Sequence, residues 1–96
     1  MSAVTRPAWA TETREPEKPG DFGAHWTTVR VGAAVIRVEQ IYDFDGGKYT
    51  PEPVFADLSD TKDIYGVGST LCDAQWCRDL AAALLHAARI IEEATL

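Results

Sequence analysis

Apolar and polar residues alternate along two consecutive stretches of the chain, residues 26–31 and 34–42. Both stretches are rich in β-branched residues, and alternation with a period of two is typical of strands that bury one face. Gly32 separates the stretches and marks a turn, so we predict two neighbouring antiparallel strands. The more apolar face of the second strand is predicted to point into the core and carries Ile36, Val38, Gln40 and Tyr42, whereas the opposite face carries Val35, Arg37, Glu39 and Ile41.

A third strand is predicted after a tight turn at residues 43–48. Two consecutive glycines in this turn supply the positive φ angles that short hairpin turns need. The chain then returns over residues 53–58. Because Pro51 and Pro53 have no N–H to donate, this strand is predicted to begin late or to lie at a sheet edge. Its apolar face carries Val54, Ala56 and Leu58.

The clearest element is a helix over residues 73–94, a stretch that contains no Gly or Pro and is rich in Ala and Leu. Asp73 is the predicted N-cap, and Thr70 with Asp73 forms an alternative capping box. Apolar residues recur at helical spacing along one face, which we predict to be buried. This stripe comprises Cys77, Leu80, Ala81, Leu84, Ala88 and Ile91, and it is flanked by Trp76, Ala83, Ala87 and Ile90.

This helix is longer than its own sheet requires. A helix of about 20 residues spans about 30 Å, which is more than a three-stranded sheet of short strands covers. The flanking apolar residues also widen the stripe beyond a single sheet contact. We therefore expect a second helix to pack there, from an identical subunit, which would give a homodimer through the C-terminal helix.

Residues 24–96 are thus predicted to form a single α+β domain, a three-stranded antiparallel sheet (β-β-β) followed by one long C-terminal helix. Residues 1–23 are predicted to be a flexible N-terminal arm. Residues 14–20 mix charge with proline, and such a composition cannot bury enough surface to offset the entropy of ordering. Trp9 is the exception in this arm, because an exposed tryptophan lowers solubility. It either folds back on the domain or contacts a partner, and folding back is favoured.

The composition is that of an ordinary globular protein, with 46% hydrophobic and 25% charged residues. No apolar run approaches the ~20 residues of a membrane span, and residues 1–20 lack the apolar stretch of a signal peptide. We therefore expect a cytoplasmic protein with no membrane partner. The net charge is −6 and no segment is basic, which argues against direct binding to DNA or RNA. Cys72 and Cys77 are too few for a disulfide scaffold and are expected to be reduced.

The loop motifs that could carry chemistry fail on spacing. Residues 43–46 resemble the start of a calcium loop, but its sixth and twelfth positions hold Lys48 and Val54 instead of Gly and Glu. Gly66 and Gly68 precede the helix as in phosphate-binding loops, but the third glycine and the P-loop lysine are missing. A solvated turn and a flexible lead-in to the helix are the favoured interpretations.

No metal or catalytic constellation is predicted either. A zinc site would need all of Cys72, Cys77, His25 and His86, but Cys77 and His86 lie nine residues apart on one helix and point to opposite faces. His86 is interpreted as a solvated histidine on the polar face. No local spacing places a histidine beside a nucleophile. We therefore predict no catalytic residue and no cofactor, and we do not expect an enzyme.

The layout of the chain also bears a resemblance to known proteins. It has a Pro-x-Trp segment, then a histidine before the first strand, then strands, and finally an alanine- and leucine-rich helix. In this order the chain resembles, over most of its length, a group of short proteins of actinobacteria and their phages. Members of that group often have a cysteine after the tryptophan, where this chain has Ala10. The resemblance implies context rather than activity, namely a small accessory protein encoded by a phage. The matching residues are Pro7, Trp9, His25, residues 80–85, Ala87 and Ala88.

The leading functional hypothesis is a small non-enzymatic module that binds another protein, which in a phage setting would be a host protein. Aromatic residues dominate interface energies, and several fall on elements expected to be partly exposed. Two alternatives remain: an acidic mimic of nucleic acid that inhibits a DNA-binding protein, and a domain with a small-molecule pocket between sheet and helix. The acids that would carry the mimicry are Glu39, Asp43, Asp45, Glu52, Asp57, Asp60 and Asp63. The predicted interaction residues are Trp9, Trp26, Tyr49, Tyr65, Trp76, Ala83 and Ile90.

Overall fold

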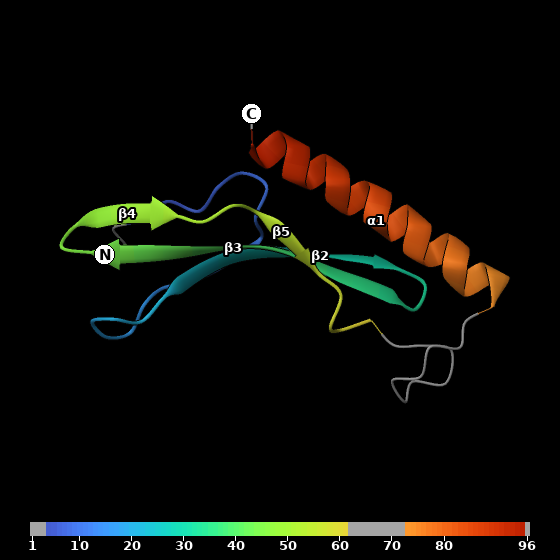
Figure 1. Cartoon of the computed structure of the whole chain (residues 1–96), viewed down its shortest axis with the longest axis horizontal. Coiled ribbons are helices and arrows are strands. Elements are labelled where there is room, and N and C mark those ends of the chain that lie inside the picture. The colour runs from blue at the N-terminus through green and yellow to red at the C-terminus, as the bar shows by residue number, and fades with distance from the viewer. Residues whose placement is uncertain (1–3, 62–72, 96) are drawn as a thin grey trace.

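The computed structural model describes residues 4–61 and 73–95, in which a helix lies across one face of an antiparallel sheet (Figure 1). This confirms the predicted α+β class, although the described sheet has five strands instead of three. The strand order is β1-β2-β3-β4, and β5 also pairs with β3. The elements are β1 (Glu12–Arg14), β2 (Gly23–Val31), β3 (Ala34–Asp45), β4 (Lys48–Pro51), β5 (Phe55–Asp57) and α1 (Ala74–Ala94).

The long β2–β3 hairpin forms the centre of the sheet. It closes through a two-residue turn in which Gly32 has a positive φ of 56°, as a turn with glycine at its first central position requires. The predicted inward face of β3 is confirmed at Ile36, Val38 and Tyr42, which are fully buried, whereas Gln40 on the same face is only partly buried. Val29 of β2 lies opposite Ile36 and completes the centre of the core.

β4 and β5 together form one edge strand beside β3, which is interrupted by a bulge. The β3–β4 hairpin turns at two glycines with positive φ, as predicted from residues 43–48. After β4, residues 52–54 lie opposite only two residues of β3, and the pairing then resumes in β5. The predicted third strand therefore lies at an edge and begins late, because Pro53 falls within the bulge.

The prediction of a flexible arm over residues 1–23 misses β1. Glu12–Arg14 pairs with β2, with Thr13 opposite His25, and the N–H of Thr11 donates to the carbonyl of Trp26 at 2.9 Å. The neighbouring prolines and charges concealed a short alternating segment that is held by its tertiary partner. Trp9 folds back and packs against the core cluster.

The helix α1 begins where predicted, with the Asp73 carboxylate accepting the N–H of Trp76 at 2.8 Å. Thr70, the other proposed cap residue, lies outside the described residues. The predicted buried stripe is wrong by a rotation of the helix: Ala83 is fully buried, whereas Leu84 is 39% exposed. Small alanines allow the helix axis to approach the sheet closely, so Ala83 and Ala87 occupy the contact and larger apolar residues lie at its margins.

The sheet has one covered and one open face. α1 contacts β2 and β3 on the covered face and leaves the end of the sheet that carries β4 without a helix (Figure 1). Within residues 4–61 and 73–95, no element packs against the opposite face. No helix in the described part of the chain is long and apolar enough to cross a membrane.

Candidate binding face

The open face of the sheet carries an aromatic and charged row across four strands. Residues directly opposite one another in adjacent strands point to the same face of a sheet. The row lies on the side away from α1, because its residues alternate with the buried positions of β2 and β3. From edge to edge it comprises Glu12, Trp26, Glu39 and Phe55.

Trp26 and Arg37 form the centre of this open face. The guanidinium carbon of Arg37 lies 4.1 Å from the centroid of a Trp26 ring, which is a cation–π contact. The Nε atom of Arg37 lies 2.7 Å from a carboxylate oxygen of Glu39, two residues along the same strand. This contact is an ion pair by distance without hydrogen-bond geometry, so the Nε–H is left without an acceptor among the described residues. Arg37 is therefore held in place between the Trp26 ring and the Glu39 carboxylate, with its Nε atom buried.

Two residues of β5 extend this centre to the sheet edge. Phe55 lies opposite Glu39 and is exposed, and Asp57 lies opposite Arg37. Hydrogen bonds from the hydroxyl and the N–H of Ser59 lower the pKa of Asp57, and the nearby Arg37 lowers it further. The Asp57 carboxylate thus stays ionised beside Arg37 at neutral pH. The central part of the open face presents an aromatic pair together with charges of both signs.

The predicted interaction residues are not brought together. Trp26 lies on the open face, whereas Tyr49 lies on the other face, near His25. Ala83 is buried where α1 packs on the sheet, so it cannot contact a partner. Tyr65 lies outside the described residues. The remaining three, Trp9, Trp76 and Ile90, are partly buried.

The sequence interpretation missed Arg37, Glu39 and Phe55 as candidate binding residues. A signal for the first two was present, because the alternation of residues 34–42 placed them on the outward face of the strand. The predicted interaction residues were selected one by one, mainly for their aromatic type, and not because they share one face of the sheet. The register with β5, which brings Phe55 into the row, depends on the bulge and was not predictable from the alternation alone.

His25 is enclosed on the covered face and has no access to a substrate. Its ring stacks on Tyr42 with centroids 4.7 Å apart. Its Nδ1 atom lies 2.8 Å from the hydroxyl of Thr13, and its Nε2 atom lies 3.2 Å from the hydroxyl of Tyr49. Burial lowers the pKa of His25, because desolvation disfavours the charged imidazolium. This cluster has the geometry of a structural core.

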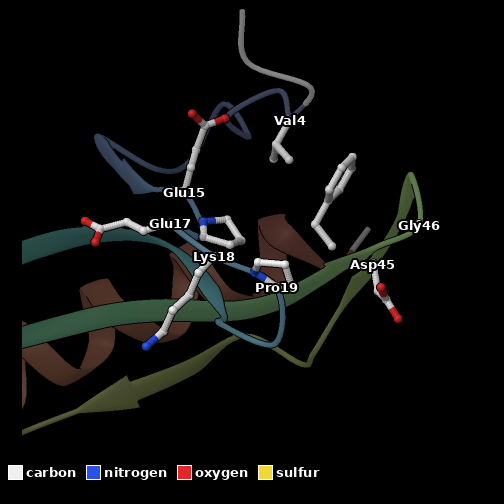
Figure 2. Close-up of a pocket in the computed structure, with 9 residues that line it drawn as sticks. Val4, Glu15, Glu17, Lys18, Pro19, Asp45 and Gly46 are labelled. Atoms are coloured by element: carbon white, nitrogen blue, oxygen red, sulfur yellow. The ribbon is translucent and has the colours of Figure 1, made fainter.

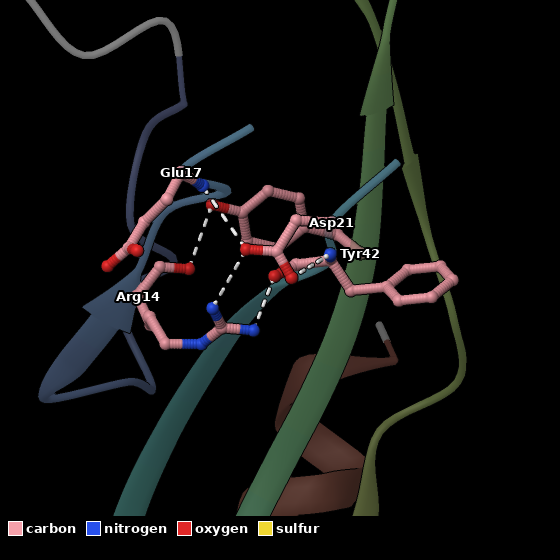
Figure 3. A network of polar contacts seen from close by, with 5 residues as sticks. Arg14, Glu17, Asp21 and Tyr42 are labelled. Atoms are coloured by element: carbon pink, nitrogen blue, oxygen red, sulfur yellow. Dashed lines mark hydrogen bonds and ion pairs between the residues drawn. The ribbon is translucent and has the colours of Figure 1, made fainter. Parts of the chain in front are cut away.

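A polar network fixes the loop between β1 and β2 (Figure 3). The Arg14 guanidinium donates to Asp21 at 3.2 Å and to the carbonyl of Phe22, and the Asp21 carboxylate also accepts the N–H groups of Glu17 and Phe22. These hydrogen bonds lower the pKa of Asp21, with the Glu17 N–H as the largest cause. Tyr42 donates to the carbonyl of Arg14 at 3.4 Å. The network anchors β1 and its loop to the sheet, and its polar groups are already engaged.

Two cavities of about 400 Å³ lie among the described residues. One is at the β3–β4 turn and is lined by residues 15–19 together with Phe44 (Figure 2). Its charged side chains, those of Glu15, Glu17, Lys18 and Asp45, point away from one another (Figure 2). The other lies between residues 7–9, Gln40 of β3 and the C-terminal end of α1, at the margin of the predicted site between sheet and helix. A selective ligand site needs polar groups that converge, and the first cavity lacks this property.

The acids proposed to mimic nucleic acid do not form a continuous array. Glu39 and Asp57 flank Arg37 on the open face. Asp45 lies opposite Lys48 in the β3–β4 hairpin, so bases interrupt this surface in two places. Asp63 lies outside the described residues. A phosphate-like row would require an uninterrupted run of one sign, which this arrangement does not favour.

Other proteins give no guide to the role of the open face. No protein-family model, curated protein or solved structure matches the chain. Among the residues that the structure describes, no three histidine, cysteine or acidic side chains lie close enough together to hold a metal ion. The function must therefore be inferred from the chemistry of the open face.

Proposed function

We propose that this chain is a protein-binding module that acts through the open face of its sheet. The observation that carries the proposal is the Trp26–Arg37 pair at the centre of a sheet face that no described element covers. Tryptophan and arginine are two of the residue types that most often carry binding energy at protein interfaces. Phe55 adds exposed aromatic area beside them.

The pair is organised before a partner arrives. The cation–π contact and the Glu39 carboxylate both restrain the Arg37 side chain, and Trp26 is half-buried between neighbouring strands. A restrained side chain loses less rotamer entropy on binding, a saving of about 0.5–1.5 kcal/mol for a side chain of this size.

The mixed charges of this face favour a protein as the partner over nucleic acid. Arg37 lies between Glu39 and Asp57, so the face is not basic, and the chain as a whole carries a net charge of −6. A polar rim around an aromatic centre is typical of transient protein interfaces. The resemblance to proteins of actinobacteria and their phages suggests a host protein as this partner.

Capture from actinobacterial lysate with matched variants tests the proposal. The tagged chain is incubated with nuclease-treated lysate, washed at low and at high salt, and its partners are identified by mass spectrometry. Two variants, Phe55→Ser and Arg37→Glu, alter the open face. Phe22→Ser is the matched control, because Phe22 is an exposed aromatic residue in the loop between β1 and β2.

A protein retained at high salt by the wild type and by Phe22→Ser, but lost from both open-face variants, would support the proposal. Equal retention by all four chains would refute a role of this face. Loss of a DNA-handling protein at high salt from every chain would instead favour the acidic mimic, because exposed charge pairs are screened by salt. Circular dichroism of each variant separates lost binding from lost folding.

A further inference from the structure

The helix α1 carries a second apolar face, which lies largely in solvent. Leu84 is 39% exposed and Leu85 is 66% exposed, and Ala81 and Ala88 beside them are exposed as well. The residues of this face recur at alternating spacings of four and three, which is the heptad spacing of coiled coils. We call this face the seam; it comprises Cys77, Ala81, Leu84, Ala88, Thr95 and Ile91, the last of which is half-buried against the core.

The seam lies beside the contact with the sheet. At about 100° per residue, its centre is roughly 100° around the helix axis from Ala83 and Ala87, the two buried residues of α1. A helix packed on the seam would therefore lie next to α1 without displacing the sheet. Ala81 and Ala88, one heptad apart, would allow the two helix axes to approach closely.

The rim of the seam carries charges that are placed symmetrically about Leu85. Arg78 lies seven residues before Leu85 and Glu92 lies seven residues after it, and all three are exposed. In an antiparallel pair of α1 helices related by a two-fold axis near Leu85, each Arg78 meets a Glu92 of the other copy. In a parallel pair these positions would lie on opposite sides of the seam, so Arg78 and Glu92 could not meet. The rim charges therefore match a second, antiparallel copy of the same helix.

We propose that the seam is covered by a second copy of this chain in an antiparallel, two-fold symmetric dimer. Leu85 contacts its own counterpart near the axis, and Leu84 of each copy packs against Ala88 of the other. Two Arg78–Glu92 ion pairs close the rim. This inference is independent of the open face, because the seam and the Trp26–Arg37 pair lie on different elements.

The size of the seam sets the strength of the dimer. A helix face of roughly 31 Å by 10 Å offers about 300 Å² per copy, whereas a standard stable interface buries about 800 Å² per partner. The dimer is therefore expected to dissociate on dilution through the micromolar range. Because it would present two open faces, dimerisation would strengthen binding to a multivalent partner without a new contact.

Sedimentation velocity of the full chain from micromolar to millimolar concentration, with rim variants, tests the dimer. The wild-type mass should rise from 10.5 kDa toward twice that value. Arg78→Glu and Glu92→Arg should each weaken the dimer by about tenfold, because each turns two attractive pairs into repulsive ones. The double variant restores opposite charges at both pairs and should return the dissociation constant to within about twofold of wild type. Glu93→Arg, a reversal at an exposed residue on the opposite side of the helix from the seam, should change nothing.

An equimolar mixture of the two single variants gives the sharpest result. Each variant repels itself, but in the mixed pair both contacts join opposite charges, so the mixture should associate more tightly than either chain alone. A wild-type mass that stays at one chain throughout would overturn the dimer and leave the seam to another protein. Weakening by Glu93→Arg to the same extent, or no recovery in the double variant, would overturn the antiparallel register. Circular dichroism confirms that each variant remains folded.

Discussion

The ring of Tyr42 lies directly over the backbone of Gly23, its partner across the β2–β3 pair. A β-carbon at Gly23 would come 2.0 Å from the Cζ atom of Tyr42. The ring has little room to move, because Tyr42 is fully buried and stacked on His25. Gly23→Ala is therefore expected to lower the free energy of unfolding by about 1–3 kcal/mol, measured by urea denaturation.

The clash, rather than backbone strain, should account for this loss, since φ at Gly23 is not positive. A double-mutant cycle with Tyr42→Leu separates the two causes, because the shorter side chain leaves space for the added methyl group. In that background the cost of Gly23→Ala should largely disappear. An unchanged cost would show that the tyrosine ring is not its cause.

Lowering the pH should destabilise the fold through His25 at pH values where the carboxylates of the chain still contribute to its stability. Burial lowers the pKa of His25 below its ordinary value of 6.5. Between 6.5 and the lowered pKa, the unfolded chain binds a proton that the folded chain does not. The free energy of unfolding therefore falls as the pH is lowered through this window, by at most about 1.4 kcal/mol per pH unit. Asp21 and Asp57, whose pKa values are lowered from 3.8, lose their contribution only below that value.

Urea denaturation between pH 5 and pH 7 with two histidine variants isolates this contribution. His25→Gln keeps hydrogen-bonding groups near Thr13 and Tyr49 but cannot be protonated, so its stability should vary less with pH than that of wild type. His86→Gln removes the exposed histidine of α1 and serves as the control. Equal pH dependence of wild type and His25→Gln would rule out His25 as the acid-sensitive group.

The orientation of α1 can be tested with the same substitution at two adjacent alanines. Ala83→Leu adds bulk where the helix contacts the sheet and should cost about 1–3 kcal/mol of unfolding free energy. Ala82→Leu places the same side chain in solvent, and its helix propensity differs little from that of alanine, so stability should change by less than about 0.5 kcal/mol. Thermal unfolding of both variants is the measurement. Similar losses would mean that the helix faces the sheet differently.

The sequence predicted the fold most accurately where the structure depends only on residues close together in the chain. The alternation in residues 34–42 placed Ile36 and Tyr42 inside, and the carboxylate of Asp73 caps the helix as expected. The face of α1 was predicted wrongly, because apolar residues cover about half of its circumference and periodicity cannot choose between two neighbouring apolar stripes. Close packing places the small alanines of α1, rather than its leucines, against the sheet. Which of the two stripes packs there depends on the distance between helix and sheet.

The candidate site was less predictable, because it depends on register. Trp26 and Arg37 are eleven residues apart in sequence, and they meet only because the turn at Gly32 aligns β2 with β3. β1 was missed for a related reason. Its three residues are too few for their alternation to indicate a strand when prolines lie nearby in the sequence. The pairing with β2 stabilises the strand instead.

The Trp26–Arg37 contact should be measurable in the free protein. A double-mutant cycle with Trp26→Leu and Arg37→Met keeps side-chain volume while removing the ring and the charge, and the expected coupling in unfolding free energy is about 0.5–1 kcal/mol. Glu39→Gln, which weakens the second restraint on Arg37, should leave most of that coupling in place, because the ring contact does not depend on the carboxylate. A coupling within experimental error would mean that Glu39 alone positions Arg37. The open face would then lack the preorganised aromatic centre on which the proposed binding depends.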